Sequence, residues 1–136
     1  MGVWFMSDEL EILAYMCGVT LFMWLPYILA RIIIVGLMPT LKYQLDNSAQ
    51  PEWAVRAKRA HYNAIENLVP FAGLVIVAYL LDATNDATYA AALAYFWLRI
   101  AHYIVFVSGI SFLRTLVFTG CWLAQLCIFY QIILAI

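Results

Sequence analysis

Polar side chains with helical spacing mark the first place where this sequence could do chemistry. Arg59 and Asn63 are four residues apart, and Asn63 and Glu66 are three apart, so all three lie along one stripe of a helix. An arginine binds a carboxylate through two parallel hydrogen bonds, and a glutamate can bind an ammonium group. The stripe therefore suits a small, peptide-like zwitterion that is anionic overall.

Three further arginines and a histidine extend this chemistry to other parts of the chain. Arg99 and His102 are three residues apart and form a similar stripe, while Arg31 and Arg114 lie in separate apolar segments. Glutathione has two carboxylates, one ammonium and a thiol, and it fits such a set. The spacing alone does not distinguish glutathione from other small anions.

The elements that must position these residues are membrane helices. Of 136 residues, 67% are hydrophobic and 11% are charged, against about 45–50% and about 25% in a soluble domain. A membrane span needs about 20 mostly apolar residues. Short connections make successive spans antiparallel. We predict one domain over residues 1–136, an all-α, up-down bundle with four transmembrane helices and a cytoplasmic loop over 38–56. The spans are expected at about 10–37, 57–81, 87–107 and 113–136.

The polar residues inside the predicted spans share one half of the membrane. At about 1.5 Å per residue from the nearest loop, Glu66 lies roughly 13 Å inside, Arg99 roughly 12 Å and Arg31 roughly 9 Å. Basic residues gather in and beside the first and third loops, which the positive-inside rule assigns to the cytoplasm. We therefore expect a polar pocket near the cytoplasmic face, with both termini on the opposite side.

Composition also argues against several other partners. The net charge is −1, so a broad attraction to nucleic acid is not expected. Cys17, Cys121 and Cys127 lie within the predicted spans and lack metal-ligand spacing, so we expect no metal and no disulfide framework.

The motifs themselves resemble those of a known family. The pattern Arg59-Ala60-x-x-Asn63-x-x-Glu66, followed by Pro70-Phe71, looks like the second-helix signature of MAPEG proteins (membrane-associated proteins in eicosanoid and glutathione metabolism). The segment "RIAHYIVF" at 99–106 is similar to that family's third helix, and "LRTLVFT" at 113–119 to the start of its fourth. The resemblance covers all four spans and is closest to the small bacterial members.

This resemblance implies a homotrimer that binds glutathione, as co-substrate, between adjacent subunits. The matching glutathione-binding positions are Arg59, Asn63, Glu66, Arg99 and His102, with Arg31 as a looser match. Arg114 matches the arginine that holds the thiol as a thiolate. The implied protein is a bacterial inner-membrane glutathione transferase or peroxidase that acts on lipophilic molecules or lipid hydroperoxides, with its active site toward the cytoplasm.

Two positions depart from the family pattern. Phe106 and Phe118 stand where relatives have tyrosines, so two hydroxyl groups that could bind the sulfur are missing. Thr115, beside Arg114, could supply one hydroxyl as a catalytic residue, and Tyr103 could supply another if it faces the pocket.

Two other functions stay open at this point. A non-catalytic family member that binds lipid or regulates a partner would keep the pocket but lack turnover. A small transporter would suit a carboxylate inside the membrane, although a one-sided group of arginines does not favour it.

Overall fold

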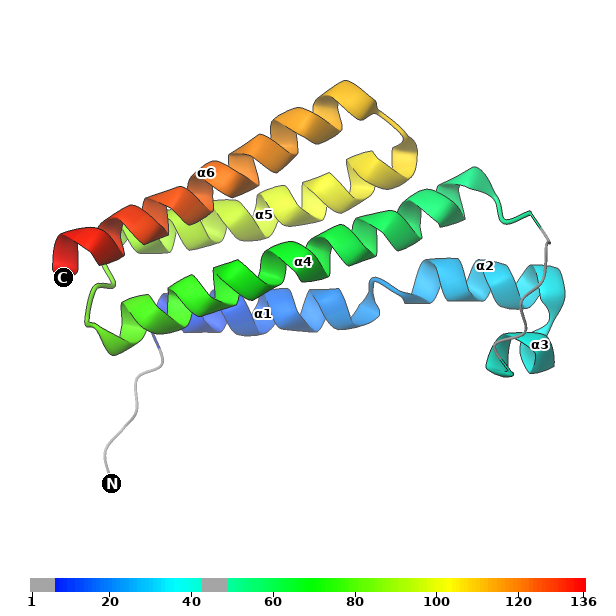
Figure 1. The fold of residues 1–136 in the computed structure, drawn as a ribbon, viewed down its shortest axis with the longest axis horizontal. Coiled ribbons are helices and arrows are strands. Elements are labelled where there is room, and N and C mark those ends of the chain that lie inside the picture. Colours follow the sequence, from blue (N-terminus) through cyan, green and yellow to red (C-terminus); the bar gives the residue numbers. More distant parts are fainter. Residues whose placement is uncertain (1–6, 43–48) are drawn as a thin grey trace.

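The computed structural model describes residues 7–42 and 49–136, which form helices joined by short connections, with no strand among them (Figure 1). Four segments are long and apolar enough to cross a membrane, and the first of them contains both α1 and α2. The chain is therefore an all-α, multi-pass membrane protein. The helices are α1 (Asp8–Phe22), α2 (Leu25–Val35), α3 (Leu37–Leu41), α4 (Glu52–Leu80), α5 (Asp86–Ser108) and α6 (Ser111–Ala135).

The first span is interrupted where the sequence predicts a continuous, kinked helix. Pro26 has no backbone N–H, and its ring would clash with the carbonyl of Phe22 in an unbroken helix. The chain accordingly leaves the helix at Met23 and Trp24, and Pro26 lies in the first turn of α2. The hydroxyl of Tyr103 donates to the Met23 carbonyl at 3.1 Å, so this carbonyl at the break keeps a partner inside the protein.

The connection between the first two spans is shorter than the predicted loop over 38–56. The short helix α3 occupies its beginning, and α4 starts at Glu52, directly after Pro51. Proline is favoured at such a start because the first helical positions need no N–H donor. The middle of the predicted loop, residues 43–48, lies outside the described residues. Because α4 starts early, Arg56 and Arg59 belong to its first two turns.

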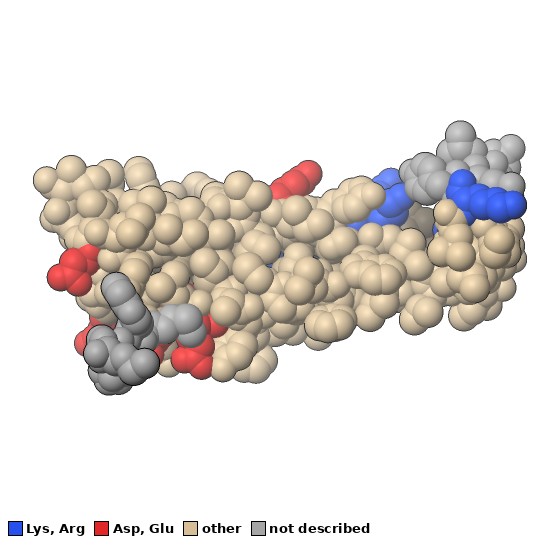
Figure 2. Space-filling model, turned by 90° about the horizontal axis from the view of Figure 1, so that it is seen from below, with Lys and Arg blue, Asp and Glu red and all other residues tan. Residues whose placement is uncertain are grey.

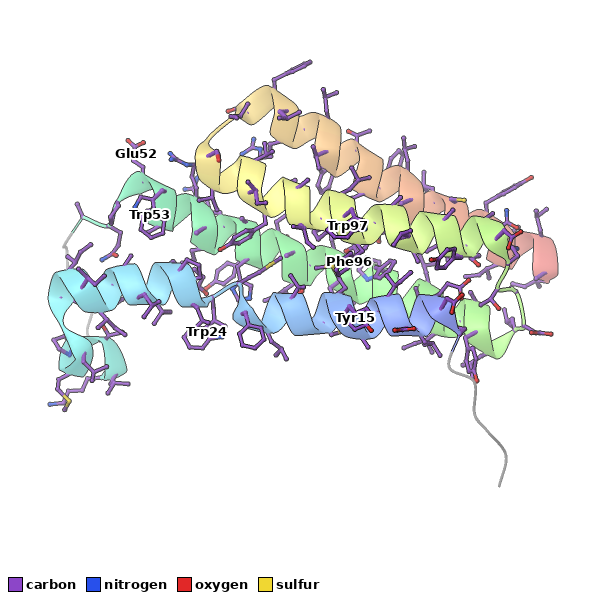
Figure 3. The ribbon with its side chains drawn as sticks, turned by 180° about the vertical axis from the view of Figure 1, so that it is seen from behind. Tyr15, Trp24, Glu52, Trp53, Phe96 and Trp97 are labelled. Atoms are coloured by element: carbon purple, nitrogen blue, oxygen red, sulfur yellow. The ribbon has the colours of Figure 1, made fainter. Side chains whose placement is uncertain are left out.

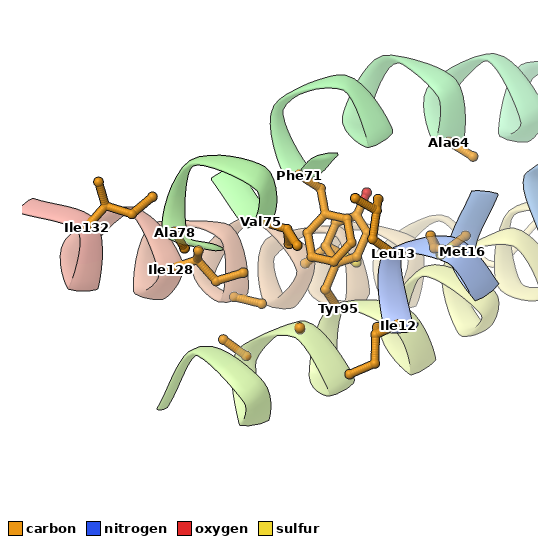
Figure 4. Packing of buried hydrophobic residues seen from close by; sticks show 14 of the residues in the cluster. Ile12, Leu13, Met16, Ala64, Phe71, Val75, Ala78, Tyr95, Ile128 and Ile132 are labelled. Carbon is orange, nitrogen blue, oxygen red and sulfur yellow. The ribbon is translucent and has the colours of Figure 1, made fainter. Parts of the chain in front are cut away.

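The core is narrow and contains one aromatic stack. The rings of Phe71 in α4 and Tyr95 in α5 are nearly parallel, with centroids 3.8 Å apart (Figure 4). Met16, Val75 and Ile128 pack around this stack and are almost fully buried. Alanines take most of the other buried positions of α4, and small side chains allow membrane helices to approach closely. This packing fixes α4 against α5, which carry most of the predicted site.

Charge separates along the bundle. In the view of Figure 2, lysines and arginines gather near one end, and most aspartates and glutamates lie toward the other. We call the first of these the arginine end. The start of α1 and the end of α6 lie together at the opposite end (Figure 1). This arrangement is the one expected of four antiparallel spans.

One carboxylate at the end opposite the arginine end is buried. Glu9 is only 4% exposed and accepts a hydrogen bond of 2.5 Å from the hydroxyl of Thr88. Asn85 caps the start of α5, and its side-chain amide donates to Gln131 in α6 at 3.0 Å. Polar side chains therefore connect the helices at this end of the bundle.

Candidate functional site

A polar pocket opens at the arginine end, where α4 begins, α5 ends and α6 begins. Its volume is about 260 Å³. Three guanidinium groups contribute to its wall, and none of the lining residues that the structure describes carries a carboxylate, so the pocket favours an anionic occupant. We call it the arginine pocket; its lining residues are Arg56, Arg59, Phe106, Gly109, Ile110, Ser111 and Arg114.

The α5–α6 turn brings Arg114 to this pocket. Gly109 has a φ of 81°, a left-handed conformation that glycine adopts without strain at the end of a helix. Its N–H and that of Ile110 both donate to the carbonyl of Val105. The chain then enters α6 at Ser111, so Arg114 lies in the first turn of that helix. Its guanidinium carbon is 4.7 Å from the centroid of the Phe106 ring, a cation–π contact between α6 and α5.

A second polar group lies inside the protomer. Arg99 is fully buried, and its Nη1 donates to the side-chain oxygen of Asn63 at 2.9 Å. Among the described residues, its Nε and Nη2 have no hydrogen-bond partner, and neither does Nδ1 of the buried His102. Unpaired polar groups in a membrane interior are costly. This set, which we call the inner cluster (Asn63, Arg99 and His102), therefore has capacity to bind further acceptors.

Two phenylalanine rings pack against the inner cluster, and one of them, Phe106, also lines the arginine pocket. The His102 ring is 5.6 Å from that of Phe106 and 6.0 Å from that of Phe118, centroid to centroid. The guanidinium carbon of Arg99 is 5.9 Å from the Phe118 centroid. Phe106 thus contacts both the inner cluster and Arg114. These are the two positions at which the sequence lacks the expected tyrosines, and both rings lie against arginines.

Five of the eight predicted site residues belong to these two sets. Arg59 and Arg114 line the arginine pocket, whereas Asn63, Arg99 and His102 form the inner cluster beside it.

Three other predicted residues line neither set within the protomer. Glu66 is exposed on α4, and Arg31 is half-buried on α2. Thr115 is exposed, and its hydroxyl donates to the Ser111 carbonyl at 3.2 Å. Tyr103, considered as a hydroxyl donor, instead bonds the Met23 carbonyl and lines a small apolar hollow of about 210 Å³ between α1 and α5.

Arg56 also lines the arginine pocket. From the sequence alone it is only one of the basic residues beside the first loop. It lies three residues before Arg59 and seven before Asn63, and that spacing puts it on the same helical stripe. Its Nε donates to the Val107 carbonyl in the last turn of α5 at 2.8 Å.

A larger apolar groove runs along α4 and α6. Its lining residues come later in both helices than those of the arginine pocket. Its volume is about 670 Å³. Asn67 and Gln125 are the amide-bearing residues in its wall, and the other lining residues include Pro70, Trp122 and Phe129. The bundle therefore offers a polar hollow at one end and an apolar one along its length.

Comparison with known proteins gives one match. The model of the MAPEG family matches residues 13–134, a range that includes the whole of α4 and α5 and both sets of site residues. No curated protein and no solved structure matches the chain.

Proposed function

Because the chain belongs to the MAPEG family, which includes glutathione transferases and peroxidases as well as other members, we propose that it is a membrane-bound glutathione transferase and glutathione-dependent peroxidase. The observation that carries this proposal is the arginine pocket, where Arg59 and Arg114 line one hollow and no described lining residue carries a carboxylate. A pocket of this kind suits a ligand with more than one negative group.

In the proposed complex, arginines bind the carboxylates of glutathione. Arg59 is exposed at the pocket and is free to form a bidentate contact. Glu66, two turns further along α4, takes the ammonium group. Arg99 and His102 supply hydrogen-bond donors from the inner cluster, where Asn63 holds the Arg99 guanidinium in a fixed orientation.

Arg114 stabilises the thiolate of glutathione. A thiol with a pKa of about 8.5 is mostly protonated at neutral pH, and a neighbouring guanidinium favours the thiolate. The thiolate sulfur then attacks a carbon electrophile, which forms a C–S bond and expels the leaving group. With a lipid hydroperoxide, two glutathione molecules are oxidised to the disulfide while the hydroperoxide is reduced to an alcohol and water. The protein contributes position and charge.

Exposed polar residues within a membrane span support assembly as a homotrimer. Glu66 is exposed in the protomer although it lies inside the span of α4, and an ionisable side chain is costly against lipid. A neighbouring subunit that packs on this face would remove Glu66 from lipid and close one side of the glutathione site. We propose that Arg31 reaches the site across this interface, from the first span of the neighbour.

The proposed protein lies in a bacterial inner membrane with the arginine end in the cytoplasm. Glutathione is abundant there, and basic residues favour that side. The lipophilic substrate reaches the pocket from the bilayer, since large apolar side chains cover most of the outer surface of the spans.

Conjugation of glutathione to a chlorinated nitrobenzene by the purified protein tests this function. We expect turnover by the wild-type protein and at least about a hundredfold loss in Arg114→Ala, comparable to the loss of one donor that stabilises a developing charge. Absence of both turnover and glutathione binding in the folded wild-type protein would refute the proposal.

A second function is favoured by one observation. Phe106 and Phe118 place phenyl rings against Arg114 and Arg99, where hydroxyl groups would otherwise face these residues. A non-catalytic member that binds lipid or regulates a partner would keep such a pocket. Glutathione binding without turnover toward either an electrophile or a hydroperoxide would favour this alternative.

A further inference from the structure

Arg56 joins the beginning of α4 to the end of α5. Its Nε donates to the carbonyl of Val107 at 2.8 Å, and its Nη1 lies 3.3 Å from a carboxylate oxygen of Glu52, one turn earlier on α4. Glu52 is at the first turn of α4 and its side chain is 92% exposed (Figure 3). The Arg56 side chain is only 32% exposed, so the contact with Val107 is the better shielded of the two.

This contact satisfies a carbonyl that α5 cannot satisfy itself. The last four carbonyls of a helix lack partners within the helix. At the end of α5, the Val105 and Phe106 carbonyls accept N–H groups of the following turn. The Val107 carbonyl accepts the guanidinium of Arg56. A cation at this position also stabilises the negative end of the helix dipole.

The same guanidinium packs directly against the turn. A Cβ built on Gly109 would lie 3.3 Å from both Cζ and Nε of Arg56. The backbone of the turn and the arginine are therefore in close contact, and a side chain on Gly109 would force the guanidinium to shift. Gly109, Ile110 and Ser111 of this turn form one wall of the arginine pocket, and Arg114 follows one turn of helix later.

We propose that Arg56 is a positioning residue, which caps α5 and holds the α5–α6 turn so that Arg114 faces the bound thiol. This inference rests on the proposed function for its catalytic consequence. The structural part of it, that Arg56 holds the turn, does not depend on glutathione. Arg56 acts through Val107 and Gly109, whereas Arg59 and Arg114 contact the ligand.

Two variants disturb this contact from opposite sides. Arg56→Lys keeps the positive charge but removes the Nε that bonds Val107. Gly109→Ala keeps Arg56 but places a methyl group against its guanidinium, at a φ where alanine is strained. Because both act on one contact, the double variant should lose no more than the more impaired single variant.

The first measurement is hydrogen–deuterium exchange of the turn in detergent-solubilised, full-length protein. The amides of residues 109–114 should exchange about tenfold faster in Arg56→Lys, the change expected from loss of one charge-assisted hydrogen bond. Lys58→Gln removes a charge from an exposed position of the same helix, and Glu52→Gln removes only the outer partner. Both should exchange like the wild-type protein.

The second measurement separates positioning from binding. Arg56→Lys and Gly109→Ala should lower kcat for conjugation about tenfold, and glutathione affinity should change less than about threefold in Arg56→Lys, which retains its charge. Unchanged exchange in Arg56→Lys would overturn the inference. Faster exchange with unchanged kcat would also overturn it, since the role would then be structural only.

The two proposals fail in different ways. If the wild-type protein neither binds nor converts glutathione, the proposed function fails, and the exchange result alone decides whether Arg56 holds the turn. If the wild-type protein is active and Lys58→Gln is as impaired as Arg56→Lys, the loss is a general effect of substitution at this end of α4, and the positioning role is wrong.

Discussion

The guanidinium of Arg99, fully buried in α5, donates a 2.9 Å hydrogen bond to the side-chain oxygen of Asn63 in α4. No carboxylate pairs with Arg99 in the described part of the chain, and two of its three nitrogens lack partners there. One neutral amide therefore orients a buried cation. The hydrogen bond joins Asn63 and Arg99 into one polar group, although they belong to different motifs of the sequence.

Replacement of Asn63 should destabilise the bundle. Asn63→Leu leaves Arg99 without this partner, and we expect a loss of about 1.5–3 kcal/mol in the free energy of unfolding, the range for a hydrogen bond to a charged group. Denaturation by sodium dodecyl sulfate in mixed micelles, followed by circular dichroism, measures the loss. Asn67→Leu is the matched control, because Asn67 bonds only the Asn63 backbone carbonyl. Equal stability of Asn63→Leu and the wild-type protein would contradict this account.

The two phenylalanines should respond differently to a restored hydroxyl. Phe106 lines the arginine pocket and Phe118 does not. We expect Phe106→Tyr to raise kcat for conjugation about tenfold, a modest share of what a well-placed donor can contribute, and Phe118→Tyr to change it less than about twofold. A steady-state comparison of both variants tests this difference. A larger gain in Phe118→Tyr would show that the sulfur lies nearer the inner cluster.

Thr88 should matter for stability and not for catalysis. Thr88→Val removes the hydroxyl that bonds the buried Glu9 at the end opposite the arginine end, and we expect a loss of about 1–3 kcal/mol. The midpoint of thermal unfolding should fall, while kcat stays unchanged. Thr119→Val is the control, since the exposed Thr119 hydroxyl bonds only a carbonyl of its own helix. A fall in kcat at full stability would refute this separation.

Loss of the hydrogen bond at the break in the first span should have a smaller effect on stability. Tyr103→Phe deprives the Met23 carbonyl of the hydroxyl from α5, and we expect about 1 kcal/mol of destabilisation, typical of a hydrogen bond between membrane helices. The exposed Tyr130 has no such bond among the described contacts, so Tyr130→Phe should have no effect on the unfolding midpoint. Equal midpoints for both variants would mean that another group or water satisfies Met23.

Local sequence was sufficient for the spans and for the spacing of the polar residues along each helix. Hydropathy and short polar turns predict four helices, and helical spacing places Arg59 and Asn63 on one stripe. Pro26 indicates a kink, but the extent of the break depends on Tyr103, which lies 80 residues away. The sequence could not supply the partner that makes the break stable.

The missed features all depend on contacts between distant parts of the chain. Local sequence does not reveal that Glu9 is buried, because its partner, Thr88, is 79 residues away. Arg56 reads as an interfacial charge because local sequence does not reveal the carbonyl of Val107, 51 residues away. Helical periodicity gives the face of one helix, and only the packing of two helices shows which residues meet.

The central claim is that this site holds glutathione as a thiolate beside Arg114, and the ultraviolet thiolate band of bound glutathione tests it most directly. At pH 7 and saturating glutathione, we predict a band in the wild-type protein, although the free thiol, with a pKa of about 8.5, is mostly protonated. Arg114→Ala should bind glutathione but lack the band. A wild-type complex without a thiolate band, or an equal band in Arg114→Ala, would contradict the account.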